Sequence, residues 1–167
     1  MKFISDRKTL LVLMLAVFFL DQLTKLWVEK TIPFGSFFNE EVIVVIPDFF
    51  RIVHVGNTGA AWSMFSGQGH ILGLLGITAL VSVFVFHKYL ELYRPINQFA
   101  FGLATGGILG NITDRFRLGH VIDFLDFKFF NYHYPSFNVA DSGICVGVLL
   151  YAIVSFRTES KKSSKTG

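Results

Sequence analysis

The sequence has few charged residues and a single cysteine. Only 16% of its 167 residues are charged, whereas 52% are hydrophobic and the mean hydropathy is +0.53. A soluble domain of this size normally carries more charge, so the composition indicates a membrane protein. Because Cys145 is the only cysteine, an intramolecular disulfide framework and a cysteine-based zinc cluster are both excluded.

The net charge of +3 does not point to a nucleic-acid partner, because the basic residues lie beside the hydrophobic segments and form no stripe of their own. The five histidines show no ligand spacing such as i, i+4, so we expect no metal site.

Four apolar segments approach the length of about 20 residues that a transmembrane helix needs. The expected spans are about 9–28, 69–87, 96–114 and 138–156. We therefore predict a single integral-membrane domain over 1–167, mainly α-helical, with four transmembrane helices. The first span is expected to be a retained helix, since Asp21 and Lys25 follow its apolar run and no small-residue cleavage site closes it. Glycines in the third span favour a packed bundle.

The loops predict an orientation. Nine of the 15 lysines and arginines lie in the N-terminus, in the loop between the second and third spans and in the tail. Positively charged loops stay on the cytoplasmic side, so both termini are predicted to be cytoplasmic. The outer region of about 30–68 has strand-like stretches and is predicted to form a small extracytoplasmic β-sheet resting on the membrane. The outer segment 115–137 is expected to be a short loop or helix, rich in aromatic residues that suit the headgroup level.

Four aspartates lie near the outer ends of these spans, namely Asp21, Asp114, Asp123 and Asp141. An ionisable group at membrane depth costs about 3 kcal/mol, so each is a candidate functional residue. The third span runs outward to Asp114 and the fourth starts inward near Asp141, which puts both carboxylates at the same depth. Two close carboxylates in a poorly solvated site share one proton, as in aspartic proteases. The open alternative is that each aspartate caps a helix or pairs with a cation such as Arg115.

Asp21 and Lys25 are four residues apart on one helix face and can form an ion pair, which is at least as consistent as a direct catalytic role. Asn111 precedes Asp114 by about one turn and is expected to point into the bundle. Asn57 lies in a turn-like stretch followed by small residues, which either admit a substrate backbone or form an ordinary turn.

Five motifs follow one another along the chain. They are DQLTK at 21–25, NTGAAW at 57–62, GGILGNITDR at 106–115, VIDF at 121–124 and FNVADS at 137–142. Each motif is weak alone, but together they resemble the lipoprotein signal peptidase family, signal peptidase II, over nearly the whole chain.

The resemblance implies an aspartic endopeptidase of the bacterial cytoplasmic (inner) membrane with its active site at the outer face. Its substrates would be prolipoproteins with a diacylglyceryl group on a cysteine, and the cut would fall just before that cysteine. The resemblance also implies binding of globomycin-type inhibitors and no metal or organic cofactor. It implies Asp114 and Asp141 as the catalytic dyad, with Asn57, Gly59, Asn111, Arg115, Asn138 and Ala140 lining the site and Asp21, Lys25 and Asp123 supporting it.

Two other classes of protein fit some of these features. A small proton- or ion-coupled carrier also uses buried aspartates, although its acids normally lie nearer the middle of the membrane and its halves repeat. A noncatalytic assembly protein would use the aspartates as packing contacts and would tolerate Asp→Asn changes. With four spans and no wide exposed heptad pattern, we expect a monomer surrounded by membrane lipid.

Overall fold

The computed structural model describes residues 7–39, 41–59 and 67–166. The helices are α2 (Lys8–Thr31), the short α3 (Ser36–Asn39), α4 (Gly69–Val85), α5 (Pro95–Leu118) and α6 (Val139–Thr166). The strands are β1 (Ile43–Ile46), β2 (Phe50–Asn57), β3 (Val121–Phe129) and β4 (Tyr132–His133). The mainly helical class with a small sheet is therefore confirmed.

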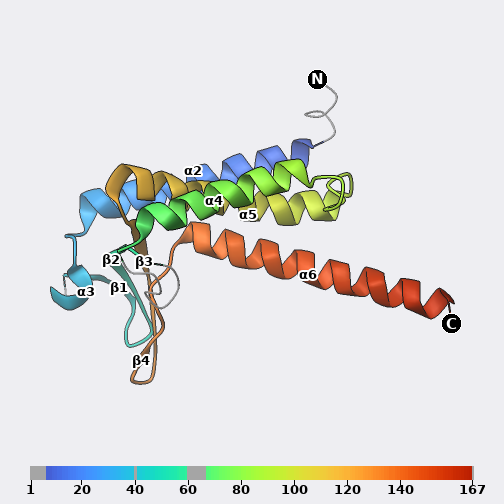
Figure 1. The fold of residues 1–167 in the computed structure, drawn as a ribbon. Helices are drawn as coiled ribbons and strands as arrows, with labels where there is room; N and C mark the ends of the chain where they lie inside the picture. The colour runs from blue at the N-terminus through green and yellow to red at the C-terminus, as the bar shows by residue number, and fades with distance from the viewer. Residues whose placement is uncertain (1–6, 40, 60–66, 167) are drawn as a thin grey trace.

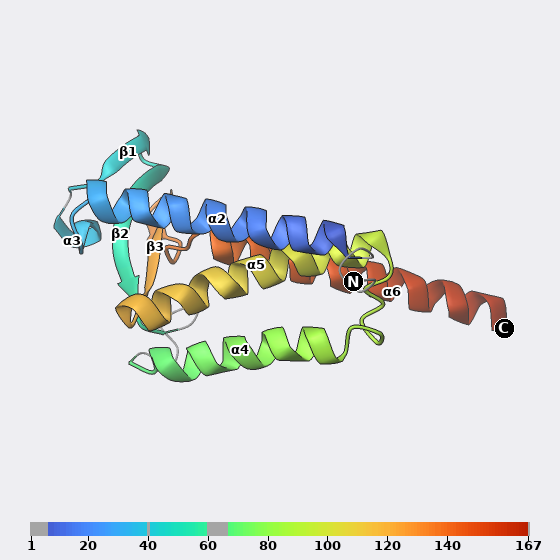
Figure 2. The same cartoon turned by 90° about the horizontal axis from the view of Figure 1, so that it is seen from above.

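The helix α5 is the centre of the bundle, and α2, α4 and α6 each pack against it (Figures 1 and 2). Two adjacent glycines of α5 allow this close approach. A Cβ on Gly106 would lie 2.6 Å from the carbonyl oxygen of Met14 in α2, and one on Gly107 would collide with the carbonyl oxygen of Ala140 in α6. The glycines of this segment thus serve a packed bundle, as the sequence predicted.

The helix α5 is one turn longer than the span expected from the sequence. Pro95 stands in its first turn, where an N–H has no partner within the helix, and Gly119 follows its last residue with φ of 78°. The true stop is therefore Gly119, in a left-handed conformation that favours glycine, and not the charged Asp114. As a result, Asp114 lies inside the helix with a further turn after it.

Two of the expected spans have the length and composition of a membrane-crossing helix in the described part of the chain. These are α2 and residues 139–157 of α6. The helix α4 is apolar but has only 17 residues, and α5 buries polar side chains such as Gln98 and Thr105 along its length. Four membrane crossings are therefore not confirmed, and the crossings of α4 and α5 stay predictions.

The sheet lies at one end of the bundle with its strands running across the helix axes (Figure 1). It is antiparallel in the order β1-β2-β3-β4. The pairing of β2 with β3 runs from Asn57 opposite Val121 to Phe50 opposite Phe127. The buried cluster that joins α2 to the sheet consists of Val28, Ile32, Ile122 and Phe124.

The outer segment 115–137 is not the loop or short helix that the sequence suggested. Residues 121–129 form β3, which pairs with β2 on one side and with β4 on the other. The helices α4 and α5 separate β2 from β3 in the chain. This long-range pairing could therefore not be predicted from local sequence patterns.

Candidate active site

The residues singled out from the sequence gather where the bundle meets the sheet. They come from the second half of α2, the end of β2, the last turns of α5, the start of β3 and the first turn of α6. Hydrogen bonds and ion pairs connect all of them in one network.

Lys25 is the centre of the helical half of this network. Its Nζ lies 2.9 Å from Asp21 Oδ2, 2.8 Å from Asp114 Oδ2 and 2.9 Å from Asn111 Oδ1. An ammonium group has three N–H donors, so these contacts use all of them. The side chains of Lys25, Asp21 and Asp114 are fully buried, and the predicted pairing of Asp21 with Lys25 is confirmed.

Asp114 is fixed on both carboxylate oxygens. Oδ2 forms the ion pair with Lys25 and accepts a hydrogen bond of 3.2 Å from the backbone N–H of Ile122. Oδ1 accepts a hydrogen bond of 3.1 Å from Gln22. The sequence left open that Asp114 pairs with a cation, and it does so with Lys25 of α2 rather than with Arg115. Gln22 was missed; its place beside Asp21 in the first motif is the only sequence signal for it.

Asp141 caps its own helix. Asn138 precedes α6 and its Oδ1 accepts the N–H of Asp141 at 2.9 Å, while Asp141 Oδ2 accepts the N–H of Asn138 at 3.2 Å. This reciprocal pair is a capping box, one of the roles that the sequence left open. The other oxygen of Asp141 accepts a short hydrogen bond of 2.7 Å from Asn111 Nδ2. Asp141 is only partly buried, so its position is compatible with contact to a substrate.

Asp123, expected to be a supporting residue, lies beside Asp141 and shares Asn138 with it. Asn138 Nδ2 donates to Asp123 Oδ1 at 2.7 Å, and Asn57 Nδ2 donates to Oδ2 at 2.9 Å. The side chain is 2% exposed. Burial, together with the negative charge of Asp141, raises the pKa of Asp123 to about 7. Asp123 therefore titrates in the range where a group can both take and give a proton.

Arg115 closes the side of the site next to β2. Its Nη2 donates to the carbonyl oxygen of Gly59 at 3.0 Å and its Nη1 to that of Asn111 at 3.4 Å. The N–H of Gly59 in turn donates to Asn57 Oδ1 at 2.9 Å, which fixes the turn after β2. The rest of the second motif, residues 60–62, lies outside the described residues.

In the described ranges no group of three or more His, Cys, Asp and Glu side chains is arranged to hold a metal ion. The side chains that the network brings together are carboxylates, amides, the buried ammonium group of Lys25 and the partly buried guanidinium group of Arg115. A pair of neighbouring carboxylates, one of which titrates near pH 7, is the arrangement of an acid–base hydrolase.

Comparison with known proteins agrees with this interpretation. Residues 13–157 match the family model Peptidase_A8, signal peptidase (SPase) II. A lipoprotein signal peptidase of Nostoc punctiforme is 40% identical over 153 residues, covering 90% of this chain and 89% of the relative. One of Syntrophotalea carbinolica is 38% identical and one of Staphylococcus aureus 36% identical, each over 92% of this chain and over 94% and 92% of the relative, respectively.

A solved structure described as a bacterial membrane enzyme superposes with a TM-score of 0.83 at 34% identity, covering 93% of this chain and 92% of the other. Fold, site and likeness thus define a bacterial membrane peptidase. More narrowly, the chain belongs to the signal peptidase II family, the lipoprotein signal peptidases, which remove signal peptides from prolipoproteins.

Proposed function

We propose that this chain is an aspartic endopeptidase that cuts diacylglyceryl-modified prolipoproteins just before the lipidated cysteine, with Asp123 and Asp141 as its catalytic pair. We pair Asp123 rather than Asp114 with Asp141 because the surroundings of these two aspartates differ. Asp123 has a pKa of about 7 beside a second carboxylate, whereas Asp114 is held by the ammonium group of Lys25. Both oxygens of Asp114 are occupied, by Lys25, by the N–H of Ile122 and by Gln22, so Asp114 is not placed to exchange a proton with water or substrate. The dyad of Asp114 and Asp141 expected from the sequence is therefore replaced in this proposal.

The proposed reaction needs one proton on the pair. The ionised carboxylate takes a proton from water, and the resulting hydroxide adds to the scissile carbonyl carbon while the protonated carboxyl gives its proton to the carbonyl oxygen. The peptide C–N bond then breaks, and the amine of the lipidated cysteine leaves with the proton taken from water. The new carboxyl terminus of the signal peptide returns the other proton, so the pair regains its starting state.

The amide network suits this chemistry. Asn57, Asn111 and Asn138 each donate to a carboxylate of the pair, which holds the two groups in place without adding charge. Each donor remains in position as the proton moves, so little reorganisation accompanies the reaction.

The exposed apolar helix surfaces support a multi-pass position in the bacterial cytoplasmic membrane. On α4, Leu74, Val81 and Phe84 are each more than half exposed, which a water-soluble chain would not leave uncovered. The polar side chains of α5 lie inside the bundle, where α2, α4 and α6 shield them from lipid. We propose four crossings, both termini in the cytoplasm and the active site at the outer face.

The two faces of the sheet support a position against the outer surface of the bilayer. Ile52 and Leu125 pack against the core on the bundle side. Side chains two residues apart share a face, so Phe50 and Phe127, which stack at 4.6 Å between ring centroids, lie on that side as well. The strands extend beyond the helices (Figure 1), so we place their aromatic face in the headgroup region of the membrane.

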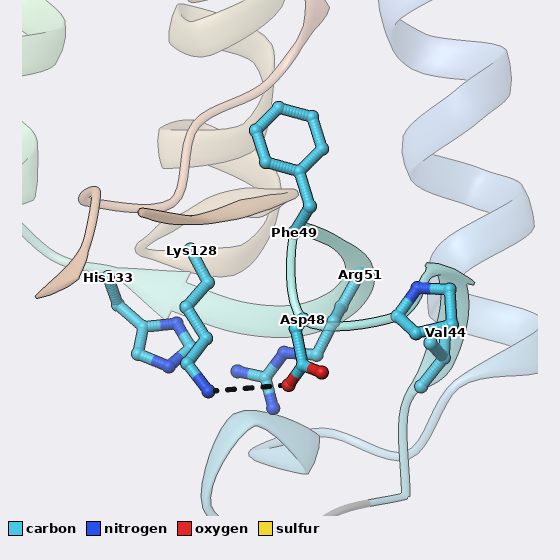
Figure 3. A pocket seen from close by; sticks show the side chains of 7 residues that line it. Val44, Asp48, Phe49, Arg51, Lys128 and His133 are labelled. Carbon is cyan, nitrogen blue, oxygen red and sulfur yellow. Dashed lines mark ion pairs between the residues drawn. The ribbon is translucent and has the colours of Figure 1, made fainter. Parts of the chain in front are cut away.

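The opposite face of the sheet is charged. Arg51 forms an ion pair of 2.6 Å with the buried Asp126, and Lys128 lies beside them. Figure 3 shows the ring of Phe49 pointing away from the side chains of Arg51, Lys128 and His133, which together with Phe49 line a cavity of about 320 Å³. An aromatic face toward lipid and charged side chains on the opposite face suit a sheet that lies on a membrane.

The partners that we propose are prolipoproteins, membrane lipid and globomycin-type inhibitors, with the chain acting as a monomer. The names of the relatives support the substrate class. The inhibitor class and the oligomeric state follow from the family resemblance and from the four-span pattern.

The test is cleavage of a diacylglyceryl-modified prolipoprotein by the purified chain in detergent. Asp123→Asn and Asp141→Asn should each lower the rate per folded molecule by at least about 100-fold, the usual contribution of a general acid or base. Asp114→Asn should keep a higher rate per folded molecule than either. The same prolipoprotein without its diacylglyceryl group is the matched substrate control and should remain uncut.

Three results would contradict the proposal. Near-parental cleavage by Asp123→Asn would remove Asp123 from the pair. Loss of cleavage in folded Asp114→Asn and Asp141→Asn, but not in Asp123→Asn, would restore the dyad expected from the sequence. A folded parent that does not cut at all would favour the proton- or ion-coupled carrier, which proton flux in liposomes would then examine.

A further inference from the structure

Lys25 touches neither member of the proposed catalytic pair, yet it is bound to a residue that does. Two of its three donors go to Asp21 and Asp114, and the third goes to Asn111 Oδ1 at 2.9 Å. Two carboxylates already compensate the charge of Lys25, so the bond to Asn111 is not needed to neutralise a buried cation.

The bond from Lys25 decides which way the amide of Asn111 points. An ammonium group can only donate, so the oxygen of Asn111 must face Lys25 and its NH₂ group must face Asp141. This NH₂ group donates to Asp141 Oδ1 at 2.7 Å, and Asn138 Nδ2 donates to the same Asn111 oxygen at 3.4 Å. The amide therefore cannot turn its oxygen toward Asp141 while Lys25 is charged.

We propose that Lys25, acting through Asn111, keeps the negative charge on Asp141 and leaves the single proton of the pair on Asp123. Lys25 and Asn111 are positioning residues in this scheme. Asp141 is then the base that takes the proton from water, and Asp123 is the acid that protonates the carbonyl oxygen. This inference rests on the proposed function and adds the direction of proton movement to it.

The other charged groups around Asp141 agree with this assignment. The groups that neighbouring elements contribute are Asp21 and Lys25 from α2, Asp114 and Arg115 from α5, and Asp123 from β3. Asp21 and Asp114 are held by Lys25, so Asp123 is the acid left to share a proton with Asp141.

The competing interpretation is that Lys25 and Asn111 only stabilise the junction of α2 with α5. A structural role lowers the amount of folded enzyme at every pH. A positioning role instead changes the pH at which Asp141 loses its proton, because a donated hydrogen bond to a charged group favours the charged form.

The first experiment is the pH–rate profile of kcat and kcat/KM for Asn111→Leu, measured with the lipidated prolipoprotein. The acidic limb should move to higher pH by about one unit or more, since the lost bond is to a charged group. The alkaline limb should stay in place, and KM should change less than kcat. Lys25→Met should move the same limb in the same direction, and the Asn111 variant keeps the test available if that chain fails to fold.

Gln22→Leu is the matched control. Gln22 donates to Asp21, Asp114 and the carbonyl oxygen of Gly110. None of these bonds is to the Asn111 side chain, so its loss should weaken the cluster without turning the amide. Its profile should fall in height with both limbs in place. An acidic limb that does not move in Asn111→Leu, or that moves equally in Gln22→Leu, would overturn the inference.

A second experiment does not depend on cleavage, so it separates this inference from the proposed function. Infrared difference spectra between pH 5 and pH 8 report the carbonyl band of a protonated aspartic acid. The band should disappear in Asp123→Asn and persist in Asp141→Asn. Disappearance in Asp141→Asn with persistence in Asp123→Asn would put the proton on the opposite residue and refute the scheme even if the parent cleaves its substrate.

Discussion

Replacing Asp123 with asparagine is expected to stabilise the folded chain above neutral pH while it removes activity. The unfolded carboxyl group titrates near 3.8 and the folded one near 7. Between these two values the unfolded state has released its proton and the folded state still binds it, so stability falls as pH rises through this window. An amide has no proton to release, and Asp123→Asn therefore escapes this loss.

The shift of about three pKa units corresponds to about 4 kcal/mol once the pH exceeds 7. Part of this gain in stability is offset, because an asparagine at this position accepts a hydrogen bond from Asn57 or from Asn138 but not from both. The unmatched donor costs about 1–3 kcal/mol. The net gain at pH 8 is therefore about 1–3 kcal/mol, or a rise in Tm of roughly 2–12 °C for a chain of this length. Near pH 4 the gain should vanish or reverse, because at this pH the titration of Asp123 lowers the stability of the parent very little.

Asp114→Asn is the matched comparison and should change stability in the opposite direction. Asp114 accepts from Lys25, Gln22 and the N–H of Ile122. An asparagine there offers a single acceptor and turns an NH₂ group toward donors. Breaking one partner of a buried ion pair typically costs about 3–5 kcal/mol.

The assay is thermal unfolding in detergent micelles at pH 4, 6 and 8, followed by tryptophan fluorescence. The parent should lose Tm relative to Asp123→Asn as the pH rises. Equal shifts at all three pH values would show that Asp123 titrates in the folded chain as it does in water. A destabilised Asp123→Asn together with an unchanged Asp114→Asn would refute the argument that separates the two carboxylates.

Two further predictions concern the bundle and the sheet. Gly107→Ala should lower stability by about 1–3 kcal/mol in the same unfolding assay, because its Cβ collides with the carbonyl oxygen of Ala140. In Gly73→Ala the new Cβ would meet the Phe116 ring at an ordinary 3.4 Å, so this control should be neutral or slightly stabilised, and equal losses would contradict the packing argument. In chains whose native tryptophans are replaced, headgroup spin-labelled lipid should quench a tryptophan at Phe129, on the aromatic face, but not one at Asp48 beside the charged cavity. Equal quenching at both positions would argue against the proposed orientation of the sheet.

The sequence by itself established the class of protein. Its apolar segments form the four long helices, and the candidate site residues chosen from its motifs belong to one network. These features depend on composition and on the spacing of residues within one segment. Both can be recognised in the sequence without knowledge of the fold. The end of α5 could also have been predicted from the sequence, because a glycine commonly follows the last residue of a helix. The charged Asp114 was instead taken as the end of the span.

Only the tertiary structure decided which carboxylates belong together. In the sequence Asp114 and Asp123 look alike, as two aspartates near the outer end of the same helix. Folding brings the ammonium group of Lys25 to one of them and the carboxylate of Asp141 to the other. The charge state of a buried acid depends on the partners that reach it through space, and these come from α2 and α6, far away in the chain. The pairing of β3 with β2 is long-range in the same way. Local sequence patterns therefore predicted the strands of the region 30–68, but neither the place of β3 in the sheet nor the proposed catalytic pair.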